Sequence, residues 1–195
     1  MTNTTNQQLQ GTIVPRASAT RPIDPGVTIG HVHLRTADID RVRAFYVDVL
    51  GFDVVMEARD VPGWGTTGDI LFLAAGGYHH HIALNTFESA GGTPPPPGHT
   101  GLFHVAIVYP GRMSLARAVA RAVAHGATLD GGRDHGGTIS VYLKDPDGNG
   151  MELYYDVPMV RWFDDQGRWL ARNEPFDPSA LAAEAEGVRS VAATA

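Results

Sequence analysis

The chain carries an internal repeat, with one copy beginning at His31 and the other at His104. In each copy a short apolar run of strand character leads to a polar turn and then to an amphipathic segment, at 39–50 in the first copy and 113–125 in the second. A glycine follows each amphipathic segment, and each copy continues through Arg-Asp into two further strand-like runs. A repeat of this kind fixes the architecture before any single motif is considered, because it indicates two units of one design.

The two amphipathic segments are predicted to be helices that cover one face of a sheet. Their apolar residues recur at helical spacing, while arginines fall on the opposite side. Asp38 or Asp40 can cap the first helix. Gly126 follows the second helix, at the point where a left-handed residue is favoured.

The composition is that of one globular domain, since 195 residues with an apolar fraction of 43% are enough for a substantial core. Fifteen basic and 21 acidic residues give a formal net charge of −6 without a basic run, which argues against a nucleic-acid partner. The absence of cysteine excludes disulfides and thiolate metal sites. No apolar stretch approaches the roughly 18–20 residues that cross a bilayer, and the polar N-terminus lacks a signal core, so a cytoplasmic protein without membrane association is predicted.

The chain divides into three parts by composition. They are a flexible N-terminal arm at residues 1–25, a globular part at 26–158 with modules near 27–90 and 100–158, and a C-terminal tail at 159–195. The run Pro94–Pro97 is the predicted linker between the modules. Trp162, Phe163 and Trp169 are large aromatic side chains that favour burial, so the tail is expected to pack back on the domain. A short helix is expected at 181–187, and the last eight residues are expected to be disordered. Whether the tail dimerises the protein stays open, a homodimer being one alternative.

Alternation along the strands assigns side chains to two faces of the sheets. In the strand at His31 and in the runs 103–108, 138–144 and 150–156, bulky apolar side chains alternate with other types. If the apolar faces meet the helices, the opposite faces line a concave, partly polar surface. Four residues are assigned to that surface, namely His31, His104, Tyr142 and Glu152.

Two imidazoles and one carboxylate on this surface are the ligand set of a metal site with open positions. Three such groups converging on one cavity would be costly to bury without a cation. His33 shares the face of His31, but His31 is the better match to His104 in the repeat. The predicted metal ligands are therefore His31, His104 and Glu152.

The run His79–His81 supplies a further candidate. By alternation His80 shares a face with Ile82, and Ile82 is predicted to take the place that corresponds to Glu152. The first module then offers no carboxylate, which leaves the 2-His-1-carboxylate arrangement associated with non-haem Fe(II). His80 would lie near the metal without binding it, where a general acid/base belongs. His135, in a glycine-rich loop, is equally well interpreted as a surface residue.

The repeat resembles the vicinal oxygen chelate (glyoxalase/bleomycin resistance/dioxygenase) superfamily over residues 27–158. The motifs that carry the resemblance are His31-Val-His-Leu-Arg-Thr-Ala-Asp, Phe45-Tyr46 and Leu50-Gly51-Phe52. The resemblance implies an α+β fold of two βαβββ modules, whose mixed sheets form an incomplete barrel around a metal site with the helices outside.

Further motifs are similar to the short catechol-2,3-dioxygenase-like (extradiol) branch. They are Tyr78–Phe87, Gly101–His104, Asp134–Gly136 and Tyr142–Tyr154. This resemblance implies a ring-cleavage dioxygenase acting on a catechol-like aromatic diol with O₂, with Fe(II), or alternatively Mn(II), on His31, His104 and Glu152. It further implies that Tyr142 hydrogen-bonds the catecholate and that His80 and His135 act close to the metal.

Two other functions are alternatives on the same fold. A glyoxalase-type isomerase or lyase, with Zn or Ni, usually has a fourth protein ligand from the last strand of the first module, and Ile82 argues against it. A non-catalytic protein that binds an antibiotic or another small molecule has no need of His31, His104 and Glu152 together.

Overall fold

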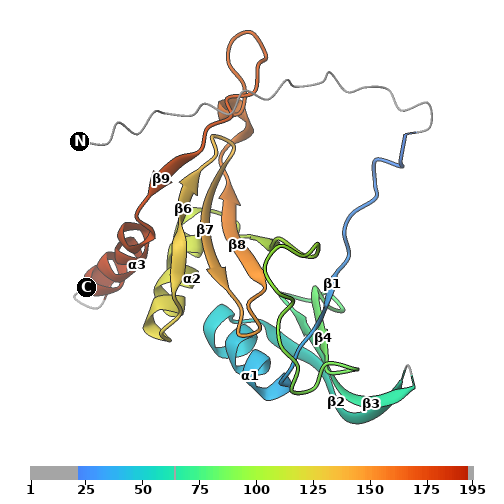
Figure 1. Cartoon of the computed structure of the whole chain (residues 1–195). Coiled ribbons are helices and arrows are strands. Elements are labelled where there is room, and N and C mark those ends of the chain that lie inside the picture. Colours follow the sequence, from blue (N-terminus) through green and yellow to red (C-terminus); the bar gives the residue numbers. More distant parts are fainter. Residues whose placement is uncertain (1–21, 64, 193–195) are drawn as a thin grey trace.

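The computed structural model describes residues 22–63 and 65–192 and has an α+β fold built on two sheets (Figure 1). One sheet has four strands in the order β1-β4-β3-β2, and the other has five in the order β5-β8-β7-β6-β9. Each sheet contains parallel and antiparallel pairs, and within the described residues the two remain separate, unclosed sheets. The predicted fold class is therefore confirmed. Most of the predicted arm at residues 1–25 lies outside the described residues.

The first module follows the order strand, helix and three strands. Its elements are β1 (Val32–Arg35), α1 (Ile39–Ala44), the π-helical segment η1 (Phe45–Leu50), β2 (Asp53–Gly63), β3 (Thr66–Ala74) and β4 (Ile82–Asn85). Strand β1 pairs parallel to β4, and the hairpin β2–β3 and the pair β3–β4 are antiparallel.

The second module repeats this order. Its elements are β5 (Val105–Val108), α2 (Arg112–Ala124), β6 (Leu129–Asp134), β7 (Thr138–Lys144) and β8 (Gly150–Asp156). Strand β5 pairs parallel to β8, as β1 does to β4. The two βαβββ units that the repeat and the resemblance implied are thus present.

The first helix begins where its cap was expected. The Asp38 carboxylate accepts hydrogen bonds from the backbone N–H groups of Asp40 at 3.0 Å and Arg41 at 3.1 Å, which satisfies donors that the helix itself leaves unpaired. The predicted helix over 39–50 is α-helical only to Ala44 and continues as the π-helical segment η1. It ends at Gly51, whose φ of +85° lies in the left-handed region that favours glycine.

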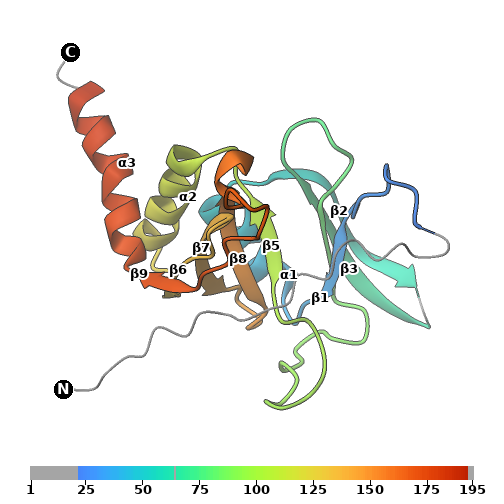
Figure 2. The ribbon, with the colours of Figure 1, turned by 90° about the horizontal axis from the view of Figure 1, so that it is seen from above.

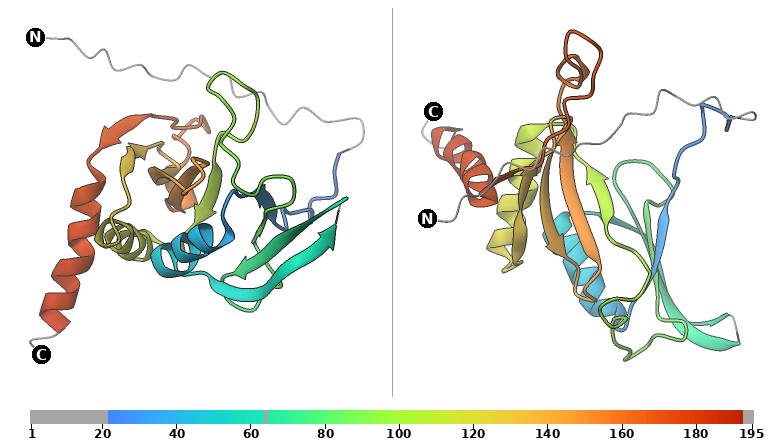
Figure 3. Two further views of the ribbon diagram at one scale, coloured as in Figure 1. Left: turned by 60° about the horizontal axis from the view of Figure 1, so that its bottom comes forward. Right: turned by 45° about the horizontal axis from the view of Figure 1, so that its top comes forward.

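One apolar core extends through both modules and joins them. The segment α1–η1 and helix α2 lie side by side on the same side of the molecule (Figures 2 and 3). The Arg121 guanidinium of α2 donates to the carbonyl of Val49 at 2.6 Å and to that of Leu50. Tyr46 of η1, fully buried, donates its hydroxyl to Asp145 after β7 at 3.2 Å. These contacts determine how the strands of one module lie relative to those of the other.

The C-terminal segment adds to the second module. It contains the 3₁₀ turn η2 (Met159–Arg161), strand β9 (Glu174–Phe176), which extends the sheet beside β6, and helix α3 (Pro178–Ala192), which packs against α2. The Trp162 indole donates to the carbonyl of Val157 at 2.6 Å.

The end of the chain differs from the prediction. The helix expected at 181–187 is longer, and residues 188–192, which were predicted to be disordered, belong to α3, while 193–195 lie outside the described residues. The physical reason is that an alanine-rich run favours helix and that Leu181, Ala182 and Ala185 are buried in the core. In the described residues no helix is long and apolar enough to cross a membrane.

Candidate functional site

The pair His104–Glu152 is the centre of the candidate site. His104 directly precedes β5, and Glu152 lies on the parallel neighbour β8, where Ala106 is its partner in the register. Since alternate residues share a face, His104 and Ala106 face the same side as Glu152. The His104 Nε2 and Glu152 Oε2 atoms are 3.0 Å apart, and both side chains are largely buried.

This spacing fits two ligands of one metal ion. Nitrogen and oxygen donors lie about 2.1 Å from an ion such as Zn²⁺, and two such donors at a right angle are about 3.0 Å apart. The second ring nitrogen, His104 Nδ1, is buried and makes no hydrogen bond within the described part of the chain. An imidazole that binds an ion through Nε2 carries its proton on this Nδ1 atom.

Tyr142 and His135 extend the pair into a chain of hydrogen bonds. Tyr142 lies opposite Glu152 in the antiparallel register of β7 and β8, and its hydroxyl donates to Glu152 Oε1 at 2.9 Å. Burial, followed by the hydrogen bond and charge of Glu152, raises the pKa of Tyr142 to about 12. Because the hydroxyl proton points to Glu152, the 2.8 Å contact from His135 Nε2 to the Tyr142 oxygen assigns an N–H donor to His135.

The His135 side chain is therefore directed at Tyr142 and is not a free surface side chain. The residue lies in the turn between β6 and β7, where its backbone N–H donates to the carbonyl of Thr138 at 3.0 Å. The C-terminal segment also reaches this turn, since the Arg172 N–H donates to the His135 carbonyl at 3.3 Å.

The first module presents a separate cluster of imidazoles. The rings of His31 and His80 have centroids 4.4 Å apart, and those of His31 and His33 are 6.5 Å apart. The Phe72 ring stacks on His80 with a centroid distance of 4.4 Å. The Asn85 amide nitrogen lies 2.8 Å from His33 Nε2. His80 thus lies beside a predicted ligand.

Two imidazoles of this cluster have lowered pKa values. Burial lowers the pKa of His80, and the neighbouring His31, His79 and His33 lower it further. Burial and His31 likewise lower the pKa of His33. A lowered pKa favours the neutral form of His80, which is the form that can accept a proton as a general base.

The structure does not bring His31 to the pair His104–Glu152. Among the described residues no group of three histidine, aspartate or glutamate side chains is arranged to hold a metal ion. The physical reason is that β1 and β5 are edge strands of two sheets that are not hydrogen-bonded to each other. The ligand set His31, His104 and Glu152 therefore stays a prediction. The structure brings together two of its members, His104 and Glu152.

The residue that corresponds to Glu152 in the first module is Ala83, not Ile82. Strand β1 pairs Val32 with Ile82 and His33 with Ala83, whereas the second module pairs Ala106, two residues after His104, with Glu152. Ile82 is buried in the core with the residues that face the helices. The alternation of faces does not extend from His80 into β4, because His80 lies in a turn before the strand. Alanine, like isoleucine, cannot bind a metal.

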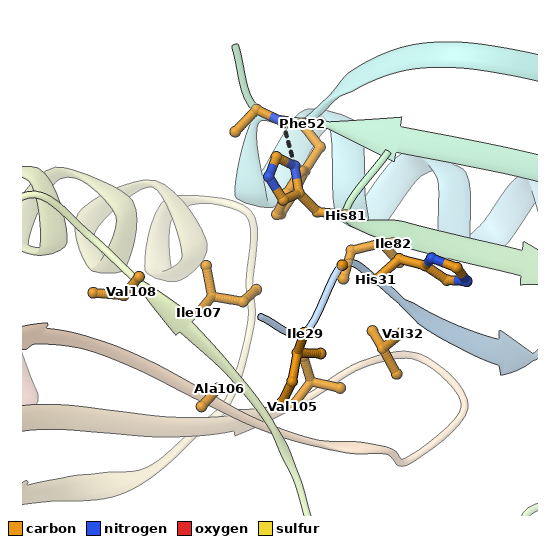
Figure 4. Close-up of a pocket in the computed structure, with 12 residues that line it drawn as sticks. Ile29, His31, Val32, Phe52, His81, Ile82, Val105, Ala106, Ile107 and Val108 are labelled. Atoms are coloured by element: carbon orange, nitrogen blue, oxygen red, sulfur yellow. Dashed lines mark hydrogen bonds between the residues drawn. The ribbon is translucent and has the colours of Figure 1, made fainter. Parts of the chain in front are cut away.

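A pocket of about 380 Å³ lies between the edge strands β1 and β5 (Figure 4). Its lining is mostly apolar and includes Ile29, Val32, Phe52, Ile82 and Val105–Val108. His31 borders it, but Figure 4 shows the His31 imidazole directed away from β5.

Sequence reasoning missed two residues of the first-module cluster, Phe72 and Asn85. The sequence contained no signal for Phe72, because it stands in the uninterrupted apolar run Ile70–Leu73; only the structure shows that Leu71 and Leu73 are fully buried while Phe72 is partly buried. No signal in the sequence indicated the contact between Asn85 and His33, because it depends on the pairing of β1 with β4.

Comparison with known proteins identifies the family to which this fold and site belong. Residues 28–153 match the Glyoxalase/Bleomycin resistance protein/Dioxygenase superfamily. The chain is 33% identical over 160 residues to a catechol-2,3-dioxygenase of Bacillus subtilis (strain 168), which covers 80% of this chain and 52% of that protein. It is 32% identical over 128 residues to biphenyl-2,3-diol 1,2-dioxygenase 3 of Rhodococcus globerulus, covering 66% of this chain and 63% of the relative. The chain therefore spans between half and two thirds of the length of these relatives.

Solved structures agree on the fold. A glyoxylase/bleomycin resistance protein/dioxygenase domain from Frankia sp. EAN1pec superposes with a TM-score of 0.56 at 19% identity, covering 67% of this chain and 98% of that one. A glyoxalase/dioxygenase from Nostoc punctiforme superposes with a TM-score of 0.52 at 23% identity, covering 72% and 99%.

Proposed function

Because the chain belongs to the glyoxalase/bleomycin resistance protein/dioxygenase superfamily, we propose that it is a metal-dependent ring-cleavage dioxygenase of the extradiol type. Its substrate would be a catechol-like aromatic diol, with O₂ as the second substrate. Two relatives whose names state dioxygenase activity support this reaction class, and they match 80% and 66% of this chain.

The observation that carries the proposal is the chain of contacts from His135 through Tyr142 and Glu152 to His104. It joins a pair of donors at metal-ligand spacing to a phenol that keeps its proton at neutral pH. A protonated phenol beside the ligand pair is suited to donate a hydrogen bond to an anionic diol oxygen.

The metal would be Fe(II), or alternatively Mn(II), held by His31, His104 and Glu152. His104 and Glu152 fit this role by their spacing, whereas His31, which directly precedes β1, would have to approach them. When bound, the ion would supply Lewis acidity that favours the ionised form of a diol hydroxyl.

The protein's own groups would bind the diol and move its proton. His80, a neutral imidazole beside His31, would accept a proton from one diol hydroxyl at a ring nitrogen and later return it. Tyr142 would turn its hydroxyl proton from Glu152 to the second diol oxygen, while the N–H of His135 holds the phenol oxygen in place.

The isomerase alternative is less well supported. It would use a carboxylate of the first module at the place that corresponds to Glu152, and the register puts Ala83 there. The binding-protein alternative gives no reason why His104 and Glu152 should lie at the spacing of two metal ligands.

Oxygen uptake by anaerobically reconstituted, iron-loaded protein tests the proposal. With a panel of catechols we expect stoichiometric oxygen consumption and a yellow ring-opened product. Iron-loaded protein that binds catechols but consumes no oxygen would overturn the dioxygenase proposal in favour of the binding protein. Stoichiometric Zn or Ni that supports isomerisation would overturn it in favour of the isomerase.

A further inference from the structure

The turn that joins β6 to β7 carries His135, and a segment from outside the two modules packs against it. This segment is the tail hairpin, residues 162–170, which follows η2 and precedes β9. It lies outside residues 28–153, which match the superfamily, and in Figure 1 it stands at the end of the second sheet where the turn lies. A part of the chain beyond the two modules is therefore placed beside a residue of the candidate site.

The Trp169 ring is fixed within the tail hairpin from two sides. The rings of Trp162 and Phe163 stand at an edge-on angle to it, with centroid distances of 5.7 Å and 5.6 Å. Phe163 and Trp169 also form an antiparallel backbone bridge. The Trp162 indole is held in turn by its 2.6 Å hydrogen bond to the Val157 carbonyl. The Trp169 ring thus has a defined place from which it can support a neighbour.

Two glycines let the tail hairpin approach the turn closely. A Cβ atom at Gly137 would lie 2.8 Å from the Trp169 ring, and one at Gly136 would clash with the Leu170 carbonyl oxygen. Gly136 has a φ of +85°, which favours glycine for conformational reasons. Gly137 has no positive φ, so the close approach of the Trp169 ring is the reason that glycine fits there.

Backbone contacts join the same turn to the chain on either side of the tail hairpin. The Arg172 N–H donates to the His135 carbonyl at 3.3 Å, and the Val157 N–H donates to the Gly137 carbonyl at 2.9 Å. Arg172 Nε also lies 3.6 Å from the Asp134 carboxylate. The place of the turn, and with it the direction of the His135 side chain, therefore depends on the C-terminal segment.

From these contacts, and on the premise of the proposed function, we propose that Trp169 is a positioning residue of the candidate site. Packed on Gly137, its ring holds the turn where the His135 Nε2–H group donates to the Tyr142 hydroxyl oxygen at 2.8 Å. A site group keeps its working geometry only when the residues that support it are themselves fixed by packing. Without the ring, the His135 imidazole would sample other directions, and the Tyr142 oxygen would lose a hydrogen bond.

The signal of the His135 N–H proton in nuclear magnetic resonance tests the proposal without metal or substrate. In metal-free protein with isotopically labelled histidine, a hydrogen-bonded imidazole N–H exchanges slowly with water and gives a resolved signal. His135→Gln and Tyr142→Phe identify this signal by removing it. We expect Trp169→Ala to abolish it and Trp169→Phe, which keeps an aromatic ring against Gly137, to retain it. Val160→Ala is the control and should retain it, since Val160 lies in the same C-terminal segment and is 86% exposed.

Gly137→Ala tests the same contact with every side chain of the tail hairpin retained. Its methyl group would meet the Trp169 ring at 2.8 Å, so we expect the same loss of the N–H signal. Gly111→Ala is the control, because a Cβ atom at Gly111 meets nothing within 4 Å. A signal of unchanged strength in Trp169→Ala or in Gly137→Ala would overturn the positioning role.

A double-mutant cycle tests whether Trp169 acts through His135. Trp169→Ala should lower kcat for catechol about threefold to tenfold, the usual effect of one lost hydrogen bond. In a His135→Gln background the same substitution should lower kcat no further. A second loss of the same size in that background would overturn the proposal, because Trp169 would then act through other residues.

The two measurements separate this inference from the proposed function. If the iron-loaded protein consumes no oxygen with any catechol and the N–H signal responds as expected, the dioxygenase proposal fails and the positioning role of Trp169 stands. If the protein cleaves catechol and the signal is unchanged in Trp169→Ala, the positioning role fails and the dioxygenase proposal stands.

Discussion

The Thr36 hydroxyl donates a hydrogen bond to the Asp147 carboxylate at 2.5 Å, across the joint between the two modules. Thr36 directly follows β1, and Asp147 lies in the turn between β7 and β8, the hairpin that carries Tyr142 and Glu152. Arg41 adds an ion pair to the same carboxylate at 2.5 Å. Asp147 therefore ties the strand next to His31 to the hairpin that holds the second half of the candidate site.

Thr36→Val should lower the free energy of unfolding by about 1.5–3 kcal/mol, because it removes a hydrogen bond to a charged group that is shielded from water. Thr66→Val is the control, since among the described residues the exposed Thr66 hydroxyl donates a hydrogen bond only to the carbonyl of its neighbour Thr67. Denaturant unfolding of both variants measures the difference. A Thr36→Val loss no larger than that of Thr66→Val would contradict a stabilising role for this contact.

Tyr142 should resist ionisation. Because its pKa in the folded protein is raised to about 12, above the usual value of 10.0, its contribution to stability is present below pH 10 and is lost as the pH rises through about 12. The stability difference between wild type and Tyr142→Phe should therefore shrink over this interval. Absorbance titration of the two proteins measures the ionisation directly, and a difference spectrum that titrates near pH 10 would contradict the assigned hydrogen bond to Glu152.

Metal binding should depend on His31 and His104 and not on His33. His104→Ala and His31→Ala should each lose most of the bound iron after anaerobic reconstitution, because each removes one of only three protein ligands. His33→Ala should retain it, although His33 lies 6.5 Å from His31 between ring centroids. Metal analysis of the three variants checks the assignment of His31 as a ligand. Loss of iron in His33→Ala together with retention of iron in His31→Ala would contradict it.

His80→Ala should retain iron and bind catechols but lose about 10²–10⁴-fold in kcat, the usual contribution of a general acid/base. Tyr142→Phe should do less damage, because it removes a single hydrogen bond to the substrate. The control is His99→Ala, in an exposed loop where the ring contacts the Pro96 carbonyl. Oxygen uptake measured alongside catechol affinity separates the two effects. An unchanged kcat in His80→Ala would show that His80 is not the general acid/base.

Much of the second half of the candidate site could be predicted from the sequence. Whether a side chain in a strand faces the helices or the opposite side follows from a period of two residues, which is a local property of the chain. This placed His104, Tyr142 and Glu152 on one face, and the structure joins them through two contacts of 2.9 and 3.0 Å. The repeat likewise predicted both modules, since each is built from neighbouring segments.

The tertiary structure alone decided how distant segments align. The register of β1 on β4 places Ala83 where the sequence suggested Ile82, because alternation does not continue through the turn that contains His80. The position of His31 relative to Glu152 depends on the angle between two sheets that share no hydrogen-bonded strand. Contacts more than 70 residues apart, such as Thr36–Asp147 and Arg121–Val49, set that angle. A local pattern contains no information about such contacts, so the sequence could name the residues of the site but not the distance between its halves.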